Sequence, residues 1–224
     1  MHTVSPDPSA RRSFLGRLGA GVVALAAGTP ALARASTAAP SPGSAADDAW
    51  LGKIKGKHRQ VFDAVSAGEQ NGLLFARNFL VSHKEAGSKD GDTTAVVVLR
   101  HWAIPYVFTD AMWAKYKLGE GFKVNDPATK APSVRNFAMN SKPGDLLLPD
   151  MSIDQLLAKN VVIVGCNMAA QYTAMVTAQA TGGKMEDVYK DLVANLIPGI
   201  TLAASGVYAV NRAQETGCSY CYAG

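Results

Sequence analysis

Cysteine and histidine are both scarce in this sequence, and their small numbers exclude two kinds of site. The 224 residues include three cysteines and four histidines. Three is a small and odd number, which does not suit the paired framework of disulfide-rich secreted domains. The same residues also lack the spacing of a tetrahedral zinc site. We therefore expect neither a disulfide scaffold nor a bound metal ion.

Motifs for nucleotide cofactors and for hydrolysis are absent as well. The 21 glycines never form G-x-G-x-x-G, and no P-loop lysine follows a glycine-rich turn. No arrangement of serine, histidine and aspartate indicates a hydrolase triad. We therefore expect no cofactor.

Positive charge is not concentrated in the part of the chain that we expect to fold. The formal net charge is +4, and most of it comes from arginines in the first 35 residues. The one later basic cluster, Lys53, Lys55, Lys57 and Arg59, is typical of a solvated face. Nucleic acid is therefore not an expected partner.

The sequence also lacks an apolar run of the roughly 20 residues that a membrane-spanning helix needs. The apolar stretch at residues 18–27 follows the pair Arg11 and Arg12, and an A-x-A pattern stands at residues 33–35. This order of segments is typical of a cleaved signal peptide, and it resembles a twin-arginine signal. We expect residues 1–35 to be removed. We also expect the mature protein to be periplasmic or secreted, with no stable membrane insertion after cleavage. The resemblance also implies export in the folded state.

The rest of the chain alternates strand-like and helix-like segments. Residues 36–57 are small and polar in their first part and are predicted to be a disordered linker, followed by one domain over residues 58–224. The strand predictions are residues 59–65, 93–100, 161–165, 198–204 and 218–222. The helix predictions are residues 69–87, 106–118, 152–160, 167–183, 185–196 and 205–217. This alternation predicts an α/β three-layer sandwich with a mainly parallel sheet of about five strands.

Residues 119–150 interrupt that alternation. They contain several prolines and glycines and no sustained hydrophobic period. They are longer than the loops that usually connect two elements of a compact domain. We interpret them as an insert. Two roles stay open for the insert. It is either a lid over a site or a surface loop that packs on the domain through Phe122, Phe137 and Met139.

Cys166 stands at the point where an apolar strand gives way to a helix, in the stretch "VVIVGCNMAA". Ligands of open α/β sheets bind beyond the carboxyl ends of the strands, and a helix N-terminus stabilises a negative charge such as a thiolate. Cys166 is therefore a candidate nucleophile, and a buried apolar cysteine is the alternative. His101 ends a neighbouring strand and is predicted to accept a proton or to form a structural hydrogen bond. Gly165 and Asn167 flank the thiol as candidate ligand-binding residues, although Asn167 also suits a helix cap.

Three stretches of the chain resemble the DsrE/DsrF-like family of sulfur-handling α/β proteins, over about residues 58–222. They are "VVVLRHWA", "VVIVGCNMAA" and "LIPGITLAASGVYAVNRAQETGCSYCY". The resemblance implies that Cys166 carries sulfur as a persulfide and that His101 assists. It also implies a homo-oligomer, a trimer or a hexamer, and a protein that donates or accepts the sulfur.

Cys218 and Cys221 form a C-x-x-C pair in the last predicted strand and are redox candidates. In an extended strand, residues i and i+3 lie about 10 Å apart, whereas a disulfide requires Cα atoms closer than about 7 Å. A bridge between them would therefore need a turn. A disulfide formed after export and a relay with Cys166 both stay open.

Two hypotheses follow. The first is an exported DsrE-like protein that accepts or carries sulfur as a persulfide on Cys166. The second is a protein of the same fold that binds a small ligand, or assembles with copies of itself, without turnover.

Overall fold

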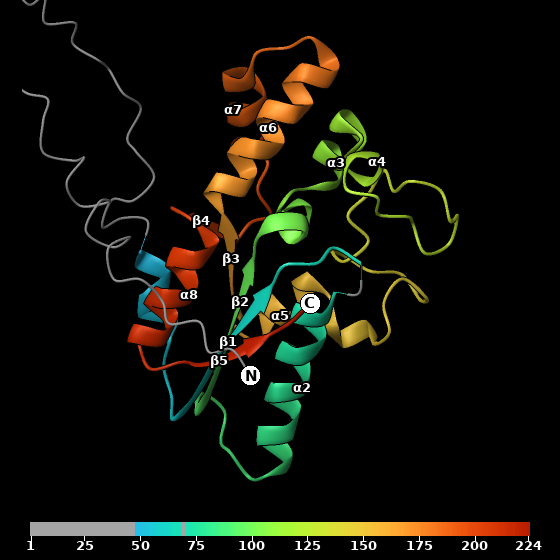
Figure 1. Ribbon diagram of the computed structural model, residues 1–224. Helices are drawn as coiled ribbons and strands as arrows, with labels where there is room; N and C mark the ends of the chain where they lie inside the picture. The colour runs from blue at the N-terminus through green and yellow to red at the C-terminus, as the bar shows by residue number, and fades with distance from the viewer. Residues whose placement is uncertain (1–47, 69) are drawn as a thin grey trace, which may run out of the picture. The chain divides into compact units, whose positions relative to one another are not determined.

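The computed structural model describes residues 48–68 and 70–224 (Figure 1). The predicted signal peptide, residues 1–35, and most of the predicted linker lie outside these ranges. Residues 48–57 belong to the linker prediction, but Ala49–Lys53 form a 3-10 helix in which Trp50 is buried, and the following Ile54 is buried as well. That part of the prediction is wrong. No helix in the described ranges is long and apolar enough to cross a membrane.

The sheet has five strands, all parallel, in the order β4-β3-β2-β1-β5 (Figure 1). The strands are β1 (His58–Ala64), β2 (Thr93–Leu99), β3 (Val162–Cys166), β4 (Thr201–Ala203) and β5 (Ser219–Tyr222). The central strands are continuously apolar and buried, as expected for a parallel sheet that is covered on both faces. The prediction of an α/β fold with about five mainly parallel strands is confirmed.

Helices cover both faces of the sheet and make it the middle of three layers. Alternate residues of each strand point to opposite faces, so Val97 and Val98 contribute to two different cores. The larger core contains residues of α2 (Asn71–Glu85), α5 (Ile153–Ala158) and α6 (Asn167–Thr181). The smaller core contains residues of α8 (Gly206–Glu215) and of η1 (Ala49–Lys53). The remaining helices are η2 (His101–Val107), α3 (Asp110–Tyr116), α4 (Leu118–Gly121), η3 (Pro149–Met151) and α7 (Met185–Ala194).

The single helix predicted over residues 106–118 is not continuous in the structure. Pro105 lies inside η2, which ends at Val107, and α3 starts three residues later. The left-handed backbone of Lys117, with φ of 50°, then separates α3 from α4. Side-chain periodicity does not reveal such breaks in the backbone.

The 119–150 insert is packed against the domain. Phe137 is buried in the larger core, and the side chain of Asn136 donates to the carbonyl oxygens of Tyr106 and Phe108 at 3.0 and 2.9 Å. Arg135 holds two carboxylates of the insert together. Of the two roles left open by the sequence, the packed surface loop agrees with these contacts.

Candidate functional site

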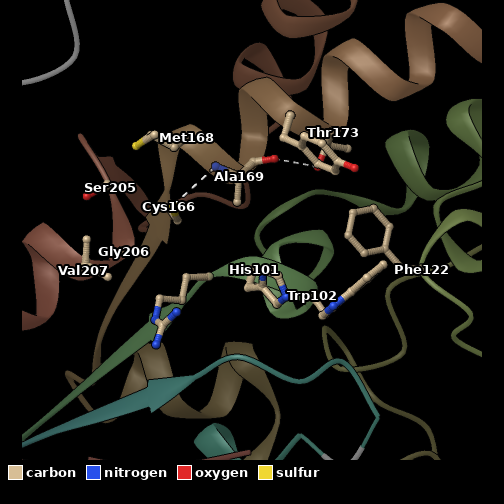
Figure 2. A pocket seen from close by; sticks show the side chains of 12 residues that line it. His101, Trp102, Phe122, Cys166, Met168, Ala169, Thr173, Ser205, Gly206 and Val207 are labelled. Atoms are coloured by element: carbon tan, nitrogen blue, oxygen red, sulfur yellow. Dashed lines mark hydrogen bonds between the residues drawn. The ribbon is translucent and has the colours of Figure 1, made fainter.

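A crevice of about 370 Å³ lies beyond the carboxyl ends of β2, β3 and β4 (Figure 2). The chain leaves β3 toward α6 on one face of the sheet and leaves β4 toward α8 on the other. Neighbouring strands whose connections diverge in this way create the usual binding crevice of open α/β sheets. The volume is within the range of small-molecule sites. We call this cavity the Cys166 crevice.

Cys166 is the last residue of β3 and the N-cap of α6. Its side chain lines the crevice but is only 7% exposed. The sulfur accepts a hydrogen bond from the backbone N–H of Ala169 at 3.4 Å, drawn as a dashed line in Figure 2. The first turn of a helix has N–H groups without partners and a partial positive charge, and both favour an anion at this position. The sequence thus places the thiol at a helix N-terminus, with a backbone N–H directed at its sulfur.

His101 lines the same crevice, directly beyond the end of β2 (Figure 2). The structure therefore brings together the two residues proposed for chemistry, although no hydrogen bond joins them within the described ranges. The backbone of His101 has φ of 53°, a left-handed conformation that costs energy in a residue other than glycine. Such strain is concentrated at functional sites. The ring of Trp102 contacts His101 edge-on, with centroids 5.6 Å apart.

Arg100 is a residue of the crevice that the sequence reasoning missed. Its guanidinium donates two hydrogen bonds to Asp63, at 2.6 and 2.8 Å, and the hydroxyl of Tyr220 donates to the same carboxylate at 3.0 Å. Asp63 is buried, and its hydrogen bonds are the main reason that the pKa of Arg100 is raised above its usual value. Arg100 lines the crevice, so a guanidinium held in an ion pair with Asp63 lies near Cys166. The only signal in the sequence that could have indicated this residue is the position of an arginine directly after an apolar strand.

Gly206, at the start of α8, makes room for the stem of Arg100. A Cβ atom at this position would lie 2.5 Å from both Cβ and Cδ of Arg100. Because Asp63 fixes the other end of that side chain, the stem cannot move away freely. The absence of a side chain at Gly206 is therefore what lets Arg100 reach the crevice.

We expect Gly206→Ala to lower the free energy of unfolding by about 1–3 kcal/mol, because the new methyl group overpacks this contact. Urea denaturation of the two proteins measures the difference. Gly52→Ala is the matched control, since a Cβ at Gly52 meets no atom within 4 Å. Equal losses in both variants would show that the contact with Arg100 is not responsible.

The walls of the crevice are mostly apolar and partly open to solvent. Trp102 is 49% exposed, Met168 64%, Tyr172 60% and Val207 66%, and all four line the crevice. Exposed large apolar side chains that gather around a cavity mark a binding site for a ligand or partner. The crevice thus combines one thiol, one guanidinium held in an ion pair, and an apolar rim.

Gly165 and Asn167, the two other residues predicted at this site, do not line the crevice. Gly165 is buried, and a Cβ there would lie 2.6 Å from the side chain of Leu202. The carbonyl oxygen of the Asn167 side chain accepts a hydrogen bond from the hydroxyl of Tyr189 at 2.6 Å, which joins α6 to α7. Packing therefore accounts for both residues in this structure.

Cys218 and Cys221 lie far from Cys166 in the sheet. They are at the β5 edge, which β1 and β2 separate from β3. Cys218 packs in the smaller core and Cys221 against the larger one, so their side chains point to opposite faces. All three cysteines are free, and burial raises the pKa of Cys218 to about 11. The structure thus brings neither thiol to the crevice, nor the two together.

The residues that the structure describes contain no group of three or more His, Cys, Asp or Glu side chains that could hold a metal ion. Comparison with known proteins adds no further assignment, because no family model matches the chain and no curated protein matches it in sequence. The function is therefore argued from the geometry of the crevice.

Proposed function

We propose that this protein accepts and carries sulfur as a persulfide on Cys166. The observation that supports this most is the position of the thiol. Cys166 lines a ligand-sized crevice, and its sulfur accepts a hydrogen bond from the backbone N–H of Ala169 at the N-terminus of α6. A thiolate is the nucleophile in sulfur exchange, and the Ala169 N–H is a hydrogen-bond donor directed at this sulfur. The resemblance of the sequence to the DsrE/DsrF-like family points to the same chemistry.

The transfer step needs a thiolate at Cys166 and a donor that carries a hydropersulfide. The proton of the Cys166 thiol passes to His101, and the thiolate attacks the outer sulfur of the donor. A new S–S bond forms at Cys166 as the S–S bond of the donor breaks, and the donor leaves as a thiolate that regains the proton. Arg100 stabilises the negative charge before and after the step.

The proposal extends to where the protein works and with what. A twin-arginine signal over residues 1–35 would export the folded chain to the periplasm or the medium. We propose a homo-oligomer, a trimer or a hexamer, that exchanges sulfur with a donor or acceptor protein. Tyr220 and Tyr222 on the edge strand β5 are 46% and 59% exposed, and an edge strand is a natural place for contacts between copies.

Mass spectrometry of the protein after incubation with a persulfide donor tests the proposal. We expect the peptide that contains Cys166 to gain the mass of one sulfur atom, and to lose it on reduction. Alkylation of the protein before the donor is added should prevent the gain. Sulfur that appears on Cys221 alone, or on no cysteine at all, would contradict the proposal.

The low exposure of Cys166, 7%, favours the second candidate function, in which the crevice binds a small ligand and the thiol only packs. The same experiment separates the two functions. A Cys166 that resists both alkylation and sulfur loading would favour ligand binding without turnover.

A further inference from the structure

A second cavity, of about 560 Å³, lies between α4 and the middle of α6. It shares three aromatic residues with the Cys166 crevice, namely Trp102, Phe122 and Tyr172. We call it the outer cavity. Because the two cavities share these side chains, they adjoin each other, and we refer to the two together as the groove.

The boundary between the two cavities is an aromatic wall. The rings of Trp102 and Phe122 meet edge-on with centroids 5.8 Å apart, and they lie beside each other in Figure 2. Trp102 and Tyr172 are about half exposed, so their faces are open to an occupant. Flat amide or apolar groups pack well against such faces. The groove therefore suits an extended organic molecule.

The charges around the outer cavity favour an anionic group at its far end. The ammonium group of Lys115 donates to Asp191 at 2.6 Å. Because of this ion pair, Lys115 is not counted as a free charge for a ligand. Lys117 lines the cavity and forms no ion pair within residues 48–68 and 70–224. Glu120 is the one acidic residue among the lining side chains. Arg100, at the other end, is likewise paired, with Asp63. Lys117 is therefore the lining cation without an ion pair in the described part of the chain, and it suits the carboxylate of a ligand.

We infer that a low-molecular-weight organic persulfide that occupies both cavities serves as the sulfur donor, so that a partner protein would act as the acceptor. The sulfur end of this donor lies at Cys166, its amide or apolar body packs on the aromatic wall, and its carboxylate lies near Lys117. This inference rests on the proposed function. In the step, Cys166 takes the outer sulfur and the organic thiolate leaves, so that one S–S bond forms and one breaks. An inorganic donor is too short to reach the outer cavity.

Two donors and two variants of α6 test the inference. Glutathione persulfide is the long, anionic donor, and hydrogen disulfide is the short one. Ala180 is exposed and lines the outer cavity, so Ala180→Trp should fill it without a change in the core. Gln179→Trp is the matched control, because Gln179 is also exposed but lines neither cavity.

We expect Ala180→Trp to slow sulfur loading from glutathione persulfide by about tenfold, the loss of roughly one good contact, and to leave loading from hydrogen disulfide unchanged. Gln179→Trp should match the unaltered protein with both donors. Lys117→Gln should raise the KM for glutathione persulfide only. Equal rates for Ala180→Trp and the unaltered protein with glutathione persulfide, or equal slowing of both donors, would overturn the inference. Failure of both donors to load the unaltered protein would instead overturn the proposed function, and the inference with it.

Discussion

Cys166→Ser is expected to abolish sulfur loading, by at least about a hundredfold, while the protein keeps its fold. A serine hydroxyl cannot form a persulfide, so the residue that carries the sulfur has no substitute in the reaction. Serine is also a good N-cap residue. Its hydroxyl oxygen can accept the hydrogen bond that the backbone N–H of Ala169 now donates to the sulfur. Loading kinetics followed by intact mass spectrometry measure the loss, and circular dichroism checks the fold.

Cys221→Ser is the matched control for this prediction. Cys221 lies in β5 and is only partly buried, and it is separated from Cys166 by two strands. We expect this variant to load sulfur at the rate of the unaltered protein. Sulfur loading that survives Cys166→Ser and disappears with Cys221→Ser would move the chemistry to the other edge of the sheet.

The sequence predicted the sheet well because burial on both faces leaves a local signature. The runs that became β2 and β3 contain almost only apolar residues, and such runs between helical patterns indicate parallel strands. The segment around Trp50 shows the limit of that approach. Its small and polar neighbours predicted a linker, but burial of Trp50 depends on contact with the α8 face of the sheet, which no local pattern encodes.

The candidate site was predictable only where it follows from strand ends. Cys166 and His101 both follow parallel strands, and carboxyl ends of parallel strands meet at one edge, so their shared crevice followed from the fold. The ion pair of Arg100 with Asp63 depends on the pairing of β1 with β2, in which Asp63 aligns with Val98. The separation of Cys218 from Cys166 depends likewise on strand order. Pairing and order are long-range properties.

Arg135→Met is expected to lower the free energy of unfolding at pH 7 by about 3 kcal/mol or more, since it leaves two buried carboxylates without their counter-charge. Arg135 donates to Asp126 at 2.6 Å and to both oxygens of Asp145 at 2.6 Å. Both carboxylates are buried, each 7% exposed. Urea denaturation at pH 7 measures the loss. Lys159→Met, which removes an exposed partner of Asp150, is the control and should change stability far less.

The pH dependence of the unfolding free energy should differ between the two proteins, and this difference identifies the cause of the loss. In the unaltered protein the hydrogen bonds from Arg135 lower the pKa of Asp145 below its usual value. Burial acts to raise the pKa of Asp126, but hydrogen bonds from Thr129, Arg135 and Ala128 outweigh it and the pKa is lowered as well. A lowered pKa contributes stability above the unfolded value of about 3.9 that is lost as the pH falls through the folded value.

Without Arg135, the pKa of both carboxyl groups in the folded state should rise, because only the backbone hydrogen bonds from Ala128, Thr129 and Lys142 remain to oppose burial. The variant therefore has less of the stability that these groups contribute above about pH 4. The difference in unfolding free energy between the two proteins should therefore be largest near pH 7 and shrink toward about pH 4. A difference that stays constant over this range would mean that Arg135 stabilises the insert through the packing of its side-chain stem, and not through its charge.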